Sequence, residues 1–248
     1  MTATVRKATV TAACAAIAAV LVAVFLAATA VAQTPEPTPR WPDGHVDLGS
    51  SVGPRGYWEV RPGLGGMPRA ADIPAQPWAR ALAQFRNSKN DLFPPLVRCK
   101  PAGGNGFFTA PGFEIVDVPP EQKIYILDIA GPHSWRVIYM DGRPHPANLR
   151  PTYLGHSIGK WEGDTLVVDT VGFNEKQWVV GAFPTTDQLH LVERISRPSL
   201  KTLSYEMTID DPGVYTRPWS GKWTITATTA SKWIAGGEVF EYICQDSR

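Results

Sequence analysis

From residue 107 onward the chain is a succession of short segments rich in β-branched and aromatic residues. Glycine, proline, aspartate and asparagine separate these segments, which are FEIVDV, KIYILDI, WRVIYMD, TLVVDTVGF, QLHLVERI, TLSYEMTI, GKWTITATT and EVFEYICQ. Several of them alternate apolar with polar residues, which is typical of strands with one buried face. Helical patterns do not alternate with them, which argues against a parallel α/β sheet. The pattern therefore predicts an all-β domain.

Two junctions between these segments predict hairpins. ILDIAGPHSWRVIYMDG contains a Gly-Pro turn, and IGKWEGDTLVVD contains a tight turn at Glu162-Gly163-Asp164. We expect an antiparallel meander that forms a lipocalin-like barrel or a strongly bent sheet. A barrel of about eight strands has room for one small ligand. An internal apolar pocket is therefore the expected site.

A Pro/Gly-rich stretch, residues 33–75, precedes the β-rich part and shows little periodicity. This composition predicts an irregular N-terminal arm that lies over the domain and is anchored by aromatic side chains such as Trp41, Tyr57 and Trp58. We expect the β-rich domain itself to span residues 76–248.

One short helix is expected at residues 77–90, PWARALAQFRNSKN. Pro77 suits the first turn of a helix because its missing N–H would have no partner there. Trp78, Leu82 and Phe85 share one face at helical spacing. We expect this apolar stripe to pack against the core.

The first 32 residues have the pattern of an export signal. Arg6 and Lys7 precede an apolar run over residues 10–30 that lacks acidic residues, and an Ala-x-Ala site ends at Ala32. We expect cleavage between Ala32 and Gln33 on the general secretory route, which leaves a periplasmic or secreted protein without stable membrane insertion. The alternative is an uncleaved anchor, because the run is long enough to span a bilayer.

Charge and cysteine content narrow the possible partners. Without the signal, the chain keeps all 23 acidic residues and loses two of its 24 basic ones, for a formal charge of −1. No basic excess remains to hold a phosphate backbone, so nucleic acid is not an expected partner. Cys99 and Cys244 remain, and in an oxidising compartment they predict one disulfide. Two separate buried thiols are the alternative.

The sequence contains no complete catalytic or metal-binding motif. H-E-x-x-H, G-x-S-x-G, the P-loop, G-x-G-x-x-G and C-x-x-C are all absent. We therefore expect no cofactor and no metal, although histidines from separate strands of a barrel could still meet. The five histidines are His45, His133, His145, His156 and His190.

Candidate residues for chemistry include two histidines and a glutamate. His156 stands at the entry to a hairpin among small residues that leave its ring accessible, and a structural role is the alternative. His190 and Glu193 belong to one strand but point to opposite faces, because successive residues of a strand alternate. Each of these two would then pair with residues of neighbouring strands.

A second candidate region is the turn that contains Asp210 and Asp211. Arg217 follows it and either pairs with one of these aspartates or holds a ligand anion. The aromatic side chains expected to fill the core or line the pocket are Trp161, Trp219 and Tyr242.

Five stretches of the chain resemble a large family of secreted, mostly uncharacterised bacterial β-rich proteins. They are DGRPHP (141–146), PTYLGHSIGKWEGDTLVVDTVGFNEK (151–176), LHLVERI (189–195), YEMTIDDPGVYTRPW (205–219) and EYICQ (241–245). The resemblance implies export and a β-rich fold, and it supplies no reaction. Members of that family often end in a Cys-His-Glu-Gly-Asn type of tail, from which Cys244-Gln245-Asp246-Ser247-Arg248 departs. The W-x-G-D-x-L pattern is also similar to lipocalin or calycin barrels, which hold apolar small molecules.

The sequence favours a periplasmic carrier barrel that binds a mostly apolar small molecule, for which His190 and the three aromatic residues above are the expected contacts. The alternative is a metal-free acid/base enzyme in the same pocket: an isomerase, lyase, cyclase or hydrolase. In that case His156 is the base, Glu193 or Asp211 is the acid or orienting group, and Arg217 stabilises an anion. A purely structural role in the envelope is the third possibility. The oligomeric state is not predicted.

Overall fold

The computed structural model describes residues 37–49, 56–59, 65–66, 68–89, 95–101, 103, 112–128, 134–179 and 182–228. It divides the chain into two compact units, Met1–Glu36 and Pro37–Arg248, and every described residue belongs to the second unit. The expected signal peptide and its cleavage site lie outside the described residues and stay predictions. Within the described part of the chain, no helix has the length and apolar character needed to cross a membrane.

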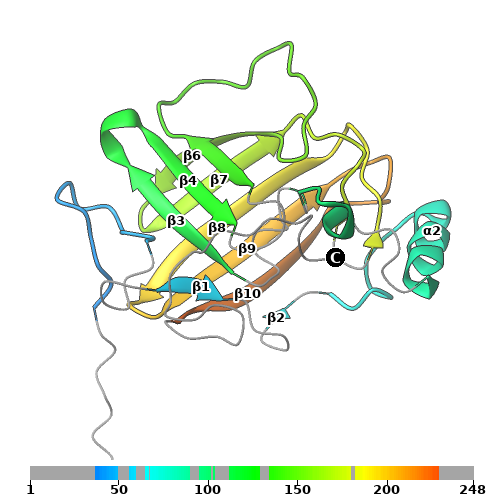
Figure 1. The fold of residues 1–248 in the computed structure, drawn as a ribbon, viewed down its shortest axis with the longest axis horizontal. Helices are drawn as coiled ribbons and strands as arrows, with labels where there is room; N and C mark the ends of the chain where they lie inside the picture. The colour runs from blue at the N-terminus through cyan, green and yellow to red at the C-terminus, as the bar shows by residue number, and fades with distance from the viewer. Residues whose placement is uncertain are drawn as a thin grey trace, which may run out of the picture. The chain divides into compact units, whose positions relative to one another are not determined.

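Nine strands form a closed barrel, and a tenth short strand pairs with one of these nine (Figure 1). The strands are β1 (Tyr57–Glu59), β2 (Gly65–Gly66), β3 (Phe113–Val118), β4 (Lys123–Asp128), β5 (Trp135–Tyr139), β6 (His156–Glu162), β7 (Thr165–Val171), β8 (His190–Ser199), β9 (Thr202–Asp210) and β10 (Trp219–Thr228). The barrel closes because β1 pairs with both β3 and β10, while β2 pairs only with β10. The expected all-β, lipocalin-like barrel is confirmed.

One pair of strands departs from the expected antiparallel meander. β5 and β6 run parallel, with Ile138 opposite Ser157, and all other pairs are antiparallel among the described strands. Parallel neighbours need a long connection that returns the chain to the same end of the sheet. Residues 140–155 make this connection, which we call the crossover segment.

Both expected hairpins are antiparallel pairs in the structure. β4 pairs with β5, and the Gly-Pro turn between them lies outside the described residues. β6 pairs with β7 from His156 opposite Val171 to Glu162 opposite Thr165. Gly163 has a φ of +59° in the turn, a left-handed conformation that glycine adopts at little cost. The glycine in Glu-Gly-Asp therefore permits the tight reversal.

The inward positions of the strands form the core. In β9, Leu203, Tyr205, Met207 and Ile209 are buried, and the residues between them are half-buried. This alternation of buried and half-buried residues is the pattern expected from the sequence for a strand with one apolar face. Figure 1 shows β8, β9 and β10 as long neighbouring strands, coloured yellow to orange-red.

Part of the stretch expected to be irregular belongs to the barrel. Tyr57 and Trp58 of β1 are fully buried, and the indole Nε1 of Trp58 donates to the carbonyl of Leu48 at 2.9 Å. Residues 37–49 lie against the barrel through hydrogen bonds of Arg197, whose guanidinium donates to the carbonyl of Asp47 at 2.7 Å. The arm therefore supplies both a closing strand and a cover for the wall.

Three helices complete the described fold: α2 (Pro77–Ser88), η1 (Pro95–Arg98) and η3 (Pro119–Glu121). The expected helix is present as α2, but the expectation that its aromatic stripe packs inward is wrong. Ala79 and Ala83 are buried in the core cluster, whereas Trp78 is 47% and Phe85 53% exposed. Arg80 fixes the rotation, because its Nη2 donates to the carbonyl of Ile73 at 2.6 Å.

Candidate active site

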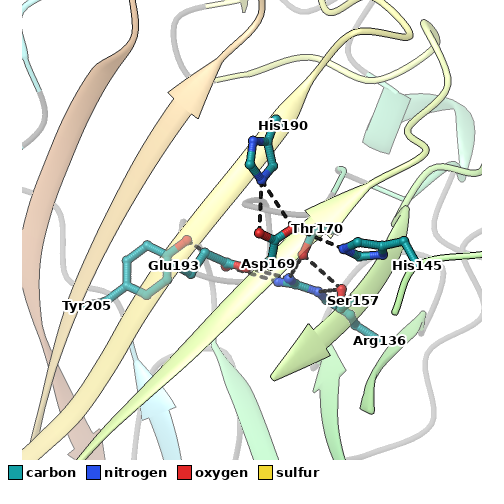
Figure 2. Close-up of polar contacts among 8 residues, drawn as sticks. All are labelled: Arg136, His145, Ser157, Asp169, Thr170, His190, Glu193 and Tyr205. Carbon is teal, nitrogen blue, oxygen red and sulfur yellow. Dashed lines mark hydrogen bonds and ion pairs between the residues drawn. The ribbon is translucent and has the colours of Figure 1, made fainter. Parts of the chain in front are cut away.

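Two polar clusters lie on opposite faces of the wall formed by β6, β7 and β8, because neighbouring residues of each strand point in opposite directions. The inward residues are Ser157, Thr170 and Glu193, and the outward residues are His156, Asp169 and His190. Figure 2 shows the contacts of the inward cluster around Glu193 and those of the outward cluster around Asp169. The sequence-based expectation that His190 and Glu193 face opposite sides agrees with their different partners.

The inner cluster is centred on a buried ion pair. Arg136 of β5 donates through Nη1 to Oε1 of Glu193 at 3.0 Å, and its Nη2 contacts Oε2. The same guanidinium donates to the hydroxyls of Ser157 at 2.9 Å and Thr170 at 2.7 Å, while Tyr205 donates to Glu193 at 2.8 Å (Figure 2). The side chains of the ion pair are 1% and 0% exposed. We call these five residues the inner network.

The charges of the inner network are fixed by their surroundings. Burial by itself lowers the pKa of Arg136, but the charge and hydrogen bonds of Glu193 outweigh it and leave the pKa raised. Burial, followed by the negative charge of Glu193, raises the pKa of Tyr205 well above its ordinary value. Tyr205 therefore keeps its hydroxyl proton and remains a hydrogen-bond donor to Glu193, and Arg136 remains charged. Both properties suit a stabilising layer inside the barrel.

The outer cluster is a chain of three histidines and one aspartate. Nδ1 of His145 lies 2.8 Å from Nδ1 of His156, and Nε2 of His145 lies 3.0 Å from Oδ1 of Asp169. On the other side, Nε2 of His190 lies 3.1 Å from each carboxylate oxygen of Asp169 (Figure 2). His145 belongs to the crossover segment, so the parallel β5–β6 connection brings it to the wall. We call these four residues the histidine chain.

The contacts of the histidine chain determine which ring nitrogens carry protons. An ionised carboxylate only accepts hydrogen bonds, so His145 donates to Asp169 from Nε2. In neutral His145 the other nitrogen, Nδ1, is then an acceptor, and His156 donates to it from its own Nδ1. His156 consequently keeps an unprotonated Nε2. Asp169 thus sets the tautomer of His156 through His145.

The ring of His156 is also held by an aromatic neighbour and a nearby cation. Tyr139 stacks on it with ring centroids 5.2 Å apart, and the guanidinium of Arg143 lies 4.2 Å from the Tyr139 ring centroid. Burial lowers the pKa of His156, and the charge of Arg143 lowers it further, as does the charge of His145 whenever that ring is protonated. The neutral imidazole is therefore favoured near neutral pH, which is the state that a general base requires.

Exposure separates the two clusters. The side chains of His145, Asp169 and His190 are 21%, 41% and 41% exposed, so solutes reach the histidine chain but not the buried ion pair. Among the residues that the structure describes, no group of three or more histidine, cysteine, aspartate or glutamate side chains is arranged to hold a metal ion.

The proposed acid and anion-binding residues lie apart from His156. Glu193 belongs to the inner network on the other face of the wall. Asp211 is fully buried and accepts hydrogen bonds from the backbone N–H and the hydroxyl of Thr186, at 2.8 and 2.5 Å. Arg217 is exposed, and it forms no ion pair with Asp210 or Asp211 in the part of the chain that the structure describes. Asp211 thus ties one loop to another.

The expected ligand-binding aromatics are also dispersed. Trp161 is half-buried against the core, and its ring centroid lies 5.1 Å from that of His45. Trp219 is buried at an edge-to-face distance of 5.5 Å from Tyr215. Tyr242 lies outside the described residues. The same is true of Cys244, so the expected disulfide with Cys99 stays a prediction.

Six residues of these clusters were missed by the sequence-based reasoning about sites: Arg136, His145, Ser157, Asp169, Thr170 and Tyr205. Two of them carried a usable signal, since Asp169 interrupts a β-branched run and Arg136 lies mid-strand in WRVIY. A charged residue inside such a segment indicates either a functional position or a buried ion pair. His145 had no comparable signal, because it lies in a connection.

Comparisons of this chain with protein-family models, with curated proteins and with solved structures find no match.

Proposed function

We propose that this protein is an acid/base enzyme that acts on a small molecule at the outer wall of its barrel, as an isomerase, lyase, cyclase or hydrolase. The observation that carries the proposal is the hydrogen-bonded series Asp169–His145–His156, in which Nε2 of His156 is unprotonated when both rings are neutral. The export signal expected at residues 1–32 would place the reaction in the periplasm.

In this proposal His156 is the catalytic base, and the other members of the series position it. Asp169 orients His145 and stabilises the positive charge that develops when His156 takes a proton. The lowered pKa keeps His156 neutral until a substrate offers its proton. A positioned base of this kind contributes about 10²–10⁴-fold to a rate.

His190 is the residue through which a substrate would first contact the chain. Its Nε2 donates to Asp169, so Nδ1 of the neutral ring is an acceptor, and no partner for it lies among the described residues. A substrate hydroxyl or amide bound there would lie beside the carboxylate that also orients His145. His190 is therefore assigned to binding.

The activity test compares the wild-type protein with His156→Ala on a panel of esters, lactones and enolisable carbonyl compounds. We expect a loss of about 10²–10⁴-fold in kcat/KM with little change in thermal stability. His45→Gln is the matched control, because His45 is also held by carboxylates, at 2.5 Å from Asp43 and 2.9 Å from Asp117. Turnover by His156→Ala at the wild-type rate would disprove the assignment.

A second measurement tests the protonation pattern without a substrate. Long-range ¹H–¹⁵N NMR distinguishes the two neutral tautomers of each histidine. We expect the proton of His156 on Nδ1 and that of His145 on Nε2 above pH 7. A neutral His156 that carries its proton on Nε2 would exclude the proposed base, whatever compounds are turned over.

A carrier function is the second candidate, and the closed barrel is the observation that supports it. The ligand would be a mostly apolar small molecule inside the barrel, away from the inner network, whose groups have no exposed surface. Native mass spectrometry of protein purified from its own periplasm is the test. A retained small molecule that His156→Ala also retains would favour carriage over catalysis.

A further inference from the structure

One side of α2 carries a partly exposed apolar stripe, next to the side on which Ala79 and Ala83 are buried. Trp78, Leu82 and Phe85 follow one another at spacings of four and three residues, which places them on one stripe of the helix. Trp78 and Phe85 are among the few large apolar side chains that are exposed in the described residues, at 47% and 53%, and Leu82 is half-buried. Lys89 continues the stripe, with its ammonium 5.6 Å from the Phe85 ring centroid.

All charged residues of this helix are basic. The segment from Pro77 to Lys89 contains Arg80, Arg86 and Lys89 and lacks acidic residues. Arg80 and Arg86 donate to the backbone carbonyls of Ile73 and Ala182, and among the described residues neither forms an ion pair with a carboxylate. Arg86 and Lys89 therefore lie beside the apolar stripe, whereas Arg80 lies on the opposite side of the helix.

Helix orientation is set by contacts that hold the stripe outward. Ala79 and Ala83 face the core, and the backbone N–H of Gln76 donates to the carbonyl of Val214 at 2.8 Å. Arg86 adds a contact with the Trp178 ring, 4.3 Å from its centroid. Because these contacts fix the rotation of α2, the aromatic residues cannot turn inward without breaking them.

We propose that α2 docks this protein on the surface of an anionic lipid bilayer. A helix with an aromatic stripe, two basic residues beside that stripe and no acidic residue has the chemistry of an interfacial helix, in which apolar side chains enter the headgroup boundary. Tryptophan suits this boundary because its ring is amphipathic. The twelve residues span about 18 Å, so both aromatic rings reach one planar surface.

A second copy of the chain fits this face less well. Stable protein interfaces bury about 800 Å² on each partner, which two partly exposed aromatic rings and one leucine do not supply. In a symmetric pair, Arg86 and Lys89 beside one stripe would also approach the same basic residues beside the other. An anionic bilayer instead complements the charge of α2.

The test is co-sedimentation with vesicles of phosphatidylcholine and with vesicles that also contain phosphatidylglycerol. The protein is taken without residues 1–32, as verified by its intact mass, so that the apolar N-terminal run does not bind lipid. This form is suitable because Pro37–Arg248 is a compact unit of its own. We expect binding to the anionic vesicles that weakens as salt is raised, and weaker binding to the neutral ones.

Variants then locate the contact. Trp78→Ala combined with Phe85→Ala should weaken binding to anionic vesicles about tenfold or more. Lys89→Gln should weaken it about fivefold without changing binding to neutral vesicles. Trp135→Ala is the matched control, since Trp135 on β5 is 63% exposed and should not matter.

Three outcomes would overturn the proposal: no binding of the wild-type protein to anionic vesicles, equal binding by the double variant, or an equal loss in Trp135→Ala. A wild-type dimer that the double variant dissociates would also overturn it, because a second copy would then cover the stripe. The salt dependence of the wild-type protein tests the proposal even where a variant does not fold.

Discussion

The inner network and the histidine chain are built from adjacent residues of the same strands, yet they differ in almost every physical property. Ser157 and Thr170 face the barrel interior, and their neighbours His156 and Asp169 face outward. The inner ion pair has no appreciable exposed surface, whereas 41% of the Asp169 side chain is exposed. One wall therefore carries a stabilising layer on one face and a candidate reaction site on the other. Substitutions on the two faces should have separable effects.

The largest expected effect on stability comes from breaking the inner ion pair. Glu193→Ala leaves the Arg136 guanidinium buried without its counter-charge, and we expect the free energy of unfolding to fall by about 3–5 kcal/mol. Urea unfolding measures it. Arg136→Met combined with Glu193→Leu is the control, and it should recover most of the loss because no charge is left buried. A loss below about 1 kcal/mol in Glu193→Ala would contradict the comparison.

Removal of one hydroxyl from the inner network should have a smaller effect. Tyr205→Phe takes away the hydrogen bond to Oε1 of Glu193, and we expect a loss of about 1–3 kcal/mol in unfolding free energy. Tyr139→Phe, on the outward face, is the matched control and should be close to neutral in stability. Equal losses in the two variants would show that the inner face is not the more sensitive one.

On the outer face, substitution should affect activity and leave stability almost unchanged. Asp169→Asn no longer requires a proton on Nε2 of His145, so we expect kcat/KM to fall about 10–100-fold while unfolding free energy changes by less than about 1 kcal/mol. Glu162→Gln, also outward on β6 and paired with Arg194 at 3.0 Å, is the control for loss of a surface carboxylate. A large loss of stability in Asp169→Asn would remove the distinction between the faces.

The smallest expected effect is on pH dependence. Because the folded pKa of His156 lies below its ordinary value of 6.5, the unfolded chain binds this proton more readily. The contribution of His156 to stability is therefore complete above pH 6.5 and is lost as the pH falls from 6.5 through the folded pKa. The acid limb of the activity profile should likewise lie below pH 6.5.

Arg143 offers a way to move that limb. Its charge is one of the causes that lower the pKa of His156, so Arg143→Gln should shift the acid limb toward higher pH. Arg150→Gln, which changes an exposed arginine of the same crossover segment, should leave the limb in place. A limb that does not move in Arg143→Gln would place its origin in a group other than His156.

The sequence predicted the wall of the barrel well because a wall is a local property. Alternation within β8 correctly separates the faces of His190 and Glu193, and the turn at Gly163 correctly predicts the β6–β7 hairpin. Which strands become neighbours is not local. The parallel β5–β6 pair depends on the path of the crossover segment, whose residues have no periodic pattern.

The candidate site was predicted only in part for the same reason. His156 was identified as a candidate base, but its partner His145 approaches from an irregular connection, and Asp169 comes from the next strand. Helix α2 shows a related limit of prediction from the sequence. Its aromatic stripe is the more hydrophobic side, yet it is the two alanines, Ala79 and Ala83, that are buried in the core.

The pairing of β1 with β10 has a consequence for how this protein folds. These two strands come from opposite ends of the described chain, with Trp58 opposite Ala227, and they close the cylinder. Contacts between residues so distant in sequence slow folding, because the entropy lost in bringing them together precedes the gain from pairing. Until β10 has emerged, β1 and β9 present unpaired edges that can recruit other chains. If the chain is exported unfolded, a factor that shields these edges would therefore raise its yield more than one that accelerates any single hairpin.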